Sequence, residues 1–189
     1  MLDKKKFYIN GEWVNPIEEN ICEVINPCNE DPFAVISLGS KEDTDFAVKS
    51  AKAAFETWKE TSKEKRIDYL EKLLSIYKKR FSEMAEAISL EMGAPMDWAT
   101  DVQTASGQTH LEDFILRLKN FKFDEHFDKK SNNHIYYEPI GVCGLITPLS
   151  GILFAEMIDE ASFPKGVFNL VNGDGSGVGT DISSHPDID

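Results

Sequence analysis

Cysteine and histidine are scarce in this sequence, and neither residue is spaced as a metal site requires. The 189 residues include three cysteines, Cys22, Cys28 and Cys143, and four histidines. The cysteines have neither the spacing of a zinc site nor the even count of a disulfide framework. The histidines form no HExxH motif and no pair four residues apart. We therefore expect no metal site, and the cysteine usage favours a reducing compartment, with the cytoplasm as the default.

Basic residues and long apolar runs are also few. Lysine and arginine number 20 against 33 aspartates and glutamates, a formal net charge of −13. A nucleic acid or an anionic membrane would meet long-range repulsion from such a chain, so we expect neither as a partner. The start, "MLDKKKFYINGEW", lacks the apolar core of a signal peptide, and no apolar run approaches the length of a membrane-spanning helix. The hydrophobic content of 41% suffices for the core of one ordinary domain.

The first third of the sequence carries signals for short strands followed by a helix. In "FYINGEWV", Asn10 and Gly11 lie between two runs rich in aromatic and β-branched residues. Both residues tolerate the positive φ of a tight turn, so we expect a hairpin here. "ICEVINP" and "FAVISLGS" are two further candidate strands. Ser40 and Asp43 have the spacing of a capping box, and the apolar residues after them predict a helix from residue 41 to about 60.

Two more helices and a ribbon are predicted next. A long helix starts at Ser62 and continues to Gly93, where glycine and the following proline stop it. Residues 96–119 have the pattern of a third helix, weakened by Gly107. Two runs then flank the polar turn "DKKSNN", which predicts a two-stranded arm. Such a ribbon is barely stable alone in water, so we expect its edge to pair with a second subunit.

The last fifty residues have the pattern of an α/β protein. "GVCGLIT", residues 141–147, is a continuous apolar run, typical of a strand that is buried on both faces of a parallel sheet. Residues 149–161 form an amphipathic helical pattern, and "GVFNLVNG", residues 166–173, is the next candidate strand. Pro148 joins the first strand to the helix with no loop between them.

A glycine-rich loop, "GDGSGVG", follows the second of these strands. Backbone without Cβ atoms can approach a phosphate closely, which makes the loop the best candidate ligand site. The dinucleotide motif G-x-G-x-x-G nevertheless fails, because its third glycine would fall on Val178 or on Thr180. On its own, the loop is more typical of a turn that leaves a strand. Cys143 lies in the middle of a predicted strand, where a thiol is usually a small buried hydrophobe rather than a nucleophile.

Several segments in order resemble one known family. They are "FYINGEWV", "VINPCNE", "AVKSAKAAFETW", "LEMGAP", "YYEPIGVCGLITP", "FPKGVFNLVNGDGSGVG" and "SSHPDID". Together they resemble the N-terminal part of an NAD(P)-dependent aldehyde dehydrogenase. Because several segments agree in register, the resemblance is far more specific than any single motif, and it covers essentially the whole chain except the junction after Pro148.

The resemblance implies an α/β fold, namely a partial Rossmann-type nucleotide-binding domain with N-terminal helices and a β-ribbon oligomerisation arm. Residues 1–120 would be the strands and helices of that domain, residues 121–138 the arm of a homo-oligomer, and residues 139–189 a partial α/β core. The implied cofactor is NAD or NADP. Its contacts carry over to backbone at the end of the first strand and to small residues in the glycine loop, here Ile146, Thr147, Pro148, Gly175 and Gly179.

The resemblance also implies two omissions. Between Pro148 and Leu149 the family has a loop with Trp-Asn, a helix and a strand ending in Lys-Pro-Ser-Glu, a unit of roughly 30 residues or more. The asparagine that helps to stabilise the oxyanion and the groups that hold the adenosine ribose would be lost with it. After Asp189 would come the pyrophosphate helix and a catalytic domain with the nucleophilic cysteine and the general-base glutamate. We therefore assign no catalytic residue, and we expect no turnover and no NAD binding by this chain alone.

Two alternatives from other functional classes stay open. The chain could be a non-catalytic interaction module that joins full-length subunits through residues 121–138, or it could bind a nucleotide without catalysis. In the family, the omitted strand lies between the strands that correspond to residues 141–147 and 167–172. We expect these two segments to keep their family positions and to flank an unfilled slot, so that the junction marks residues missing from the sequence rather than a redesigned turn. Direct pairing of the two strands would contradict this expectation.

Overall fold

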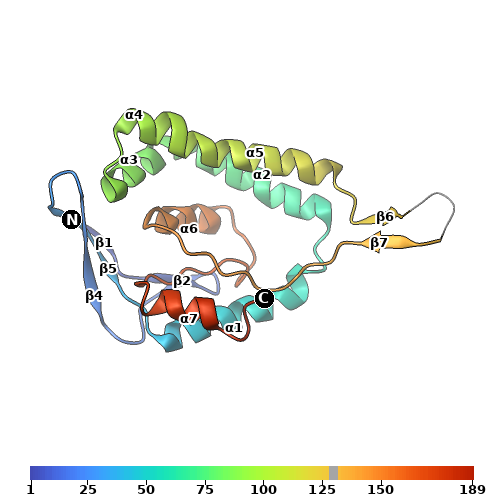
Figure 1. The fold of residues 1–189 in the computed structure, drawn as a ribbon, viewed down its shortest axis with the longest axis horizontal. Coiled ribbons are helices and arrows are strands. Elements are labelled where there is room, and N and C mark those ends of the chain that lie inside the picture. The colour runs from blue at the N-terminus through green and yellow to red at the C-terminus, as the bar shows by residue number, and fades with distance from the viewer. Residues whose placement is uncertain (128–131) are drawn as a thin grey trace.

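Most of the fold consists of helices arranged around one central helix, α6 (Ser150–Glu160). The computed structural model describes residues 1–127 and 132–189. Figure 1 shows one group of helices on one side of α6 and a second group on the other. The first group comprises α2 (Lys63–Lys79), α3 (Phe81–Met92), α4 (Met96–Trp98) and α5 (Ala105–Asn120), and the second comprises α1 (Lys41–Trp58) and α7 (Val178–Ser184). No helix in the described ranges is long and apolar enough to cross a membrane.

The predicted hairpin and the two further predicted N-terminal strands form, and a short strand that was not predicted, β1 (Leu2–Lys4), pairs with one of them. Strands β2 (Phe7–Ile9) and β3 (Glu12–Val14) pair antiparallel around Asn10 and Gly11, whose φ angles of 53° and 73° are those the tight turn requires. The other three strands form a separate sheet in the order β1-β5-β4, with β1 parallel and β4 antiparallel to β5. Their bounds are β1 (Leu2–Lys4), β4 (Ile21–Ile25) and β5 (Pro32–Ser37).

Helix α1 begins at the predicted capping box. The Ser40 hydroxyl accepts a hydrogen bond from the Asp43 backbone N–H, and the Asp43 carboxylate accepts one from the Ser40 N–H. The other carboxylate oxygen of Asp43 accepts a hydrogen bond from the Ile17 N–H at 3.1 Å. The capping box therefore also holds the chain segment that follows the hairpin.

The single helix predicted from Ser62 to Gly93 is wrong, because it is broken at Arg80. This residue has φ −99° and ψ 19°, so α2 ends and α3 begins there. Its guanidinium contacts Glu83 of α3 and Glu156 of α6, each at 2.7 Å. The break lets both helices pack on α6. The predicted stop is confirmed, since Gly93 ends α3 in the left-handed conformation with φ 67°.

The helix predicted over residues 96–119 is present as one helical run with an irregular centre. A π-helix, η1 (Ala99–Thr104), connects α4 to α5. Gly107, which weakens the helical pattern, lies against Tyr77 of α2, where an added Cβ would come within 2.4 Å of the tyrosine oxygen. The Tyr77 hydroxyl donates a hydrogen bond to the Thr104 carbonyl at 3.0 Å. The glycine is thus required by close packing of two helices.

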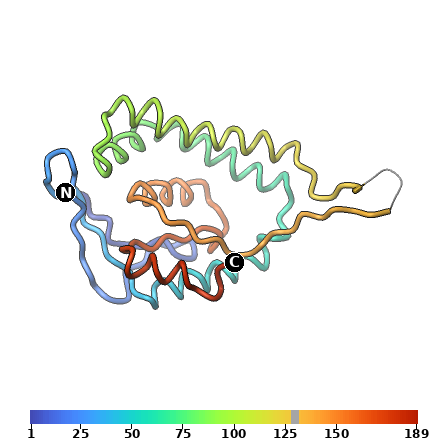
Figure 2. Tube along the Cα trace, in the orientation of Figure 1, coloured from blue at the N-terminus to red at the C-terminus, as the bar shows by residue number. Residues whose placement is uncertain are grey.

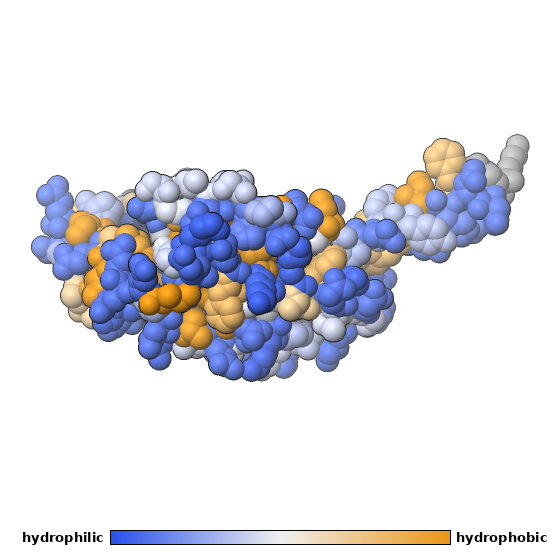
Figure 3. Space-filling view, turned by 90° about the horizontal axis from the view of Figure 1, so that it is seen from below, coloured by the Kyte–Doolittle hydropathy of each residue, from blue (hydrophilic) through white to orange (hydrophobic). Residues whose placement is uncertain are grey.

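The predicted ribbon forms between β6 (Asp124–His126) and β7 (His134–Tyr136), which pair antiparallel. It projects from the body of the molecule in Figures 1 and 3. Most of the predicted turn "DKKSNN" lies outside the described residues. At its base, Phe121 packs against Phe123 and Tyr137, with ring centroids 4.9 and 5.1 Å apart.

Two predicted strands are not formed. Residues 141–147 and 166–173 lie outside any named strand, and the second segment begins with a turn at Gly166. Among their described residues, only Leu170 makes an isolated bridge, to Tyr8. A strand needs a hydrogen-bonding neighbour on at least one edge, and these segments find none along most of their length. Figure 2 shows the C-terminus close to the first segment, where the Asp189 N–H donates to the Val142 carbonyl at 3.0 Å.

Helix α6 has the predicted amphipathic pattern and fills the centre of the core. Leu153, Met157 and Ile158 are buried, while Asp159 and Glu160 are exposed. The buried residues pack in one cluster with residues from the hairpin, α2 and α3, including Tyr8, Leu73, Ile76, Tyr77 and Met84. Burial of each large side chain stabilises the fold by about 1.5–3 kcal/mol. The body of the molecule therefore depends on this helix.

Glycine at position 166 should be essential for stability. Gly166 has φ 79°, and a Cβ there would lie 2.6 Å from the Ser50 carbonyl oxygen of α1. We expect Gly166→Ala to lower the free energy of unfolding by about 1–3 kcal/mol, measured by urea denaturation. Gly175→Ala is the matched control, since no atom lies within 4 Å of its Cβ position. Equal stability of the two variants would contradict this account.

A buried carboxylate at the start of α6 destabilises the fold to an extent that depends on pH. The Ser150 N–H donates to the Glu91 carboxylate at 2.5 Å, and the other Glu91 oxygen is buried with no partner among the described residues. Burial raises the pKa of Glu91, although the bond from Ser150 opposes this. Because the folded pKa lies above the usual value, the stability due to this group is complete at low pH and is lost as pH rises through the raised pKa.

We therefore expect Glu91→Gln to raise the free energy of unfolding at pH 8, because the amide removes the buried charge. The difference from the unsubstituted chain should shrink as pH falls through the raised pKa of Glu91 toward about 4.3, the usual pKa of glutamate. Urea denaturation between pH 4 and 8 measures it. Glu86→Gln, at an exposed position of the same helix, should show no such trend. A less stable Glu91→Gln variant at pH 8 would refute the argument.

Candidate functional site

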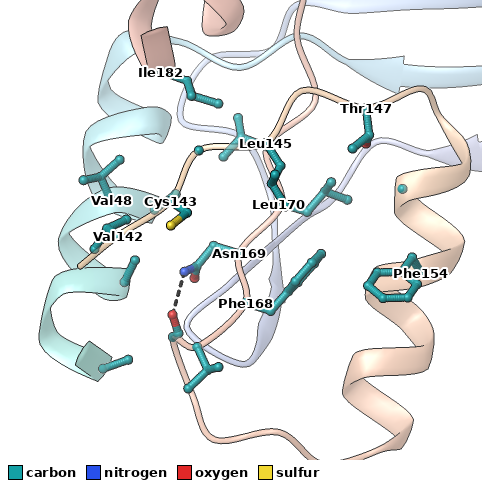
Figure 4. Close-up of a pocket in the computed structure, with 18 of the residues that line it drawn as sticks. Val48, Val142, Cys143, Leu145, Thr147, Phe154, Phe168, Asn169, Leu170 and Ile182 are labelled. Carbon is teal, nitrogen blue, oxygen red and sulfur yellow. Dashed lines mark hydrogen bonds between the residues drawn. The ribbon is translucent and has the colours of Figure 1, made fainter. Parts of the chain in front are cut away.

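A large apolar cavity separates the two extended segments that were predicted to be strands. Its volume is about 720 Å³, and we call it the slot. One side is formed by residues 141–145 and 147, and the other by residues 166–171. Figure 4 shows both segments passing between α1 and α6, whose side chains Val48 and Phe154 line opposite walls. The two segments are not paired, which agrees with the expected unfilled slot.

The first segment exposes most of its backbone. The Val142 N–H and carbonyl both bond to Asp189, the former through the aspartate side chain. Among the described residues, the backbone groups of residues 143–146 have no hydrogen-bond partner. Cys143, predicted to be buried, is exposed because the sheet neighbour that would cover it is absent. Leu145 is 75% exposed for the same reason.

The second segment is anchored along one edge only. Leu170 exchanges two backbone hydrogen bonds with Tyr8, of 2.7 and 3.1 Å, and the Asn172 carbonyl accepts from the Gly39 N–H. In an extended chain, the backbone groups of alternate residues point to the same side. Those of Asn169 and Val171 therefore point away from the hairpin, and they have no backbone partner among the described residues. This free edge is the second edge of the slot.

The predicted cofactor contacts at the end of the first segment lie at the surface. Ile146 is 70% exposed and Pro148 is exposed. The Thr147 hydroxyl points back to the Pro148 carbonyl at 3.2 Å, and an added Cβ on Gly151 would meet it at 2.6 Å. Pro148 and Leu149 start a turn, in which the Gly151 N–H donates to the Pro148 carbonyl at 3.0 Å.

The glycine loop is bonded to itself. Asp174 accepts a hydrogen bond from the Gly177 N–H through its side chain at 2.6 Å and one from the Gly179 N–H through its carbonyl at 2.9 Å. The Asp174 carboxylate thus binds a backbone N–H that a phosphate would need, and its negative charge repels an anion. Gly175 is open, with no atom within 4 Å of a Cβ position. The loop as it stands fits a turn better than a phosphate site.

The two groups of predicted contacts belong to neighbouring elements. Ile182 of α7 packs so closely on Gly144 that a Cβ there would lie 2.6 Å from it. Helix α7, which follows the glycine loop, therefore packs on the middle of the first segment. Asp174 was missed by the sequence analysis, although an aspartate three residues before a glycine at a helix start is a common capping arrangement.

Two histidines of the described chain contact aspartates. In the described part of the chain, no cluster of three or more histidine, cysteine or acidic residues could hold a metal. His185 contacts Asp45 at 3.2 Å, and His134 contacts Asp124 at 2.7 Å in the arm. Neither histidine is hydrogen-bonded to any of the three cysteines. These contacts are structural.

Known proteins match this chain over its whole length. The sequence pattern of the aldehyde dehydrogenase family matches residues 13–149 and 146–189. A 3-succinoylsemialdehyde-pyridine dehydrogenase from Pseudomonas is 37% identical over 221 residues, covering all of this chain and 46% of that enzyme. A crystal structure of an aldehyde dehydrogenase from Bartonella henselae is 44% identical with a TM-score of 0.95, covering all of this chain and 46% of that one.

A third relative contains ligands. A variant of aldehyde dehydrogenase C from Pseudomonas syringae, in complex with NAD⁺ and octanal, is 36% identical with a TM-score of 0.93. The match covers 98% of this chain and 44% of that enzyme. The chain therefore spans about half the length of the relatives it matches, and its mixed helices and strands correspond to part of an α/β aldehyde dehydrogenase domain.

The comparisons also locate the omission. The Pseudomonas match extends over 221 positions against the 189 residues of this chain, a difference of 32. The family match divides into two segments that meet at residues 146–149. Both findings agree with the predicted omission of roughly 30 residues after Pro148. The TM-score of 0.95 shows that the elements on either side keep the positions they have in the Bartonella enzyme. In sequence and in fold, this chain belongs to the aldehyde dehydrogenase family.

Proposed function

We propose that this chain is part of the nucleotide-binding domain of an NAD(P)-dependent aldehyde dehydrogenase and that it has no activity by itself. The observation that carries the proposal is a match over the whole chain that spans only 46% of the related enzymes. Residues 1–120 and 139–189 would belong to that domain, and residues 121–138 would be the oligomerisation arm. The cysteine usage favours the cytoplasm as the compartment.

In the complete enzyme, we assign the cofactor contacts to Ile146, Thr147, Pro148, Gly175 and Gly179. The exposed end of the first segment and the open position at Gly175 leave room for a ligand. NAD or NADP would accept the hydride of the substrate when bound. The residues of this chain fit that cofactor only in part, because Asp174 occupies amides of the glycine loop.

Aldehyde oxidation needs groups that this chain does not bring together. A thiolate must add to the aldehyde, so that hydride can leave from the tetrahedral adduct, and water must be activated to hydrolyse the thioester. Cys143 and Cys28 are exposed, and Cys22 donates its thiol hydrogen to the Glu23 carbonyl at 3.5 Å. None of the three is hydrogen-bonded to a histidine or to a carboxylate among the described residues.

We expect the purified chain to give no NADH or NADPH with a panel of aldehydes, followed by absorbance at 340 nm. Titration calorimetry should likewise detect no binding of NAD at submillimolar concentration. The full-length Bartonella relative, assayed in parallel, is the positive control. Robust turnover would refute the proposal, and a rate that survives replacement of all three cysteines by serine would also refute the thiolate mechanism.

A second candidate function, joining full-length subunits, is favoured by the arm. The strands and the residues next to them present apolar and aromatic side chains to solvent, including Phe127, Ile135, Tyr136 and Tyr137. The outer edges of β6 and β7 have no sheet neighbour in the described part of the chain. Exposed edges and aromatic side chains of this kind are typical of surfaces that pair with another chain.

We expect the chain to self-associate through the arm, measured by sedimentation velocity. Tyr136→Lys should shift the distribution toward monomer, because it places a charge in the contact. Phe114→Lys on α5 is the matched control, since these aromatic side chains are 65% and 58% exposed, respectively. Mixing with a full-length relative and native mass spectrometry would reveal hetero-oligomers. Identical behaviour of the two variants would exclude the arm as the contact.

A further inference from the structure

The slot has the properties of a site for a missing strand. We propose that it accepts an extended apolar strand of a second polypeptide, and that this strand is part of a segment equivalent to the 32 positions by which the Pseudomonas relative exceeds this chain. The proposal concerns polypeptide binding, so it stands whether or not the chain takes part in catalysis. Three observations carry it: the free backbone on both sides, the apolar walls and the place where the chain is shortened.

Both edges of the slot offer free backbone groups. On one side, the backbone groups of residues 143–146 have no partner among the described residues, and because Val142 bonds to Asp189, those of Cys143 and Leu145 point the opposite way. On the other side, the backbone groups of Asn169 and Val171 point away from the hairpin. A single inserted strand would satisfy both rows of donors and acceptors, as in strand addition to a sheet edge. A small ligand could not satisfy groups spread along two segments.

The side chains that line the slot determine which kind of segment it can bind. Among the described residues, no charged side chain lines the slot, although the whole chain carries a net charge of −13. The lining is mostly aliphatic and aromatic, with residues such as Val48 of α1, Phe154 of α6 and Leu170. A strand covered by helices on both faces is apolar along its whole length. The slot thus favours an uncharged apolar strand over a nucleotide, whose phosphates would find no cation here.

The position of the shortening identifies the occupant. The family match divides at residues 146–149, and Thr147, Ser150 and Gly151 line the slot. A segment inserted after Pro148 would therefore leave and re-enter the chain at the mouth of the slot. This places the absent segment, rather than an unrelated peptide, beside the free edges.

Chemical protection of Cys143 tests the proposal directly. The probe is a synthetic peptide with the sequence of the Pseudomonas relative that aligns opposite the Pro148–Leu149 junction. Cys143 lines the slot and is exposed, whereas Cys28 is exposed at a distance, beside Gly93. We expect micromolar peptide to slow alkylation of Cys143 by iodoacetamide and to leave Cys28 unchanged, as mapped by mass spectrometry. A scrambled peptide of the same composition should protect neither.

A matched pair of variants tests the site. Leu145→Glu places a charge in the slot, and Leu116→Glu places one on α5; the leucines are 75% and 60% exposed, so neither change disturbs the core. We expect the first to weaken peptide binding, measured by fluorescence anisotropy, by at least about tenfold, and the second to change it less than about twofold. Circular dichroism checks that both variants are folded.

Hydrogen exchange supplies the second measurement. Bound peptide should protect the amides of residues 143–146 and of Asn169 and Val171, which are free in this structure. Three results would overturn the proposal: no binding at submillimolar peptide, protection confined to the arm or α5, or binding that Leu145→Glu leaves unchanged. Failure here would leave the activity and calorimetry results of the proposed function unaffected, so the two can be judged separately.

Discussion

The structure depends on the polar contacts that α6 makes with Arg80, the N-terminal sheet and the hairpin, and on the buried face of this helix. Glu156 of this helix contacts Arg80 at 2.7 Å and Lys4 at 2.5 Å, so one carboxylate connects the break between α2 and α3 to the N-terminal sheet. Asp159 accepts hydrogen bonds from Tyr8 and Trp13 of the hairpin, and burial with this carboxylate nearby raises the pKa of Tyr8 to about 12. The two ion pairs of Glu156 are partly buried, so they are stronger than exposed pairs.

Contacts with other parts of the chain explain how the two extended segments keep their arrangement although no strand lies between them. The extended segments are not held by each other but by other parts of the chain. Leu170 is fixed by Tyr8, Val142 by Asp189, and Gly144 by Ile182 of α7. The segments therefore keep the positions of the Bartonella enzyme without the strand that would lie between them.

Local signals predicted the elements whose partners are close in sequence. Asn10 and Gly11 specify their hairpin turn, and Ser40 and Asp43 specify the start of α1, through contacts within three residues. The amphipathic pattern of α6 was equally clear. The break at Arg80 could not be predicted in this way, because it depends on Glu156, which is 76 residues away. An apolar run also indicates a strand without revealing that its sheet neighbour is absent.

The candidate site was predictable only in part. Ile146, Thr147, Pro148, Gly175 and Gly179 came from resemblance to a family, and the structure shows only that α7, after the glycine loop, packs on Gly144 of the first segment through Ile182. The role of Asp174 depends on the conformation of the loop around it, which no spacing rule described. The lack of a P-loop or a complete dinucleotide motif agrees with a loop whose amides Asp174 already occupies.

Residues near the N-terminus contact residues more than 150 positions later in the chain. This has a consequence for synthesis on the ribosome. Asn10 bonds to Asn169, 159 residues later, and Lys4 contacts Glu156, 152 residues later. At about 5–20 residues per second, the nascent hairpin waits roughly 8–30 s for these partners. During that time Phe7 and Ile9, which are fully buried in the finished fold, lack the cover that Val171 provides. The newly made N-terminus is therefore a natural client for chaperones that hold apolar segments.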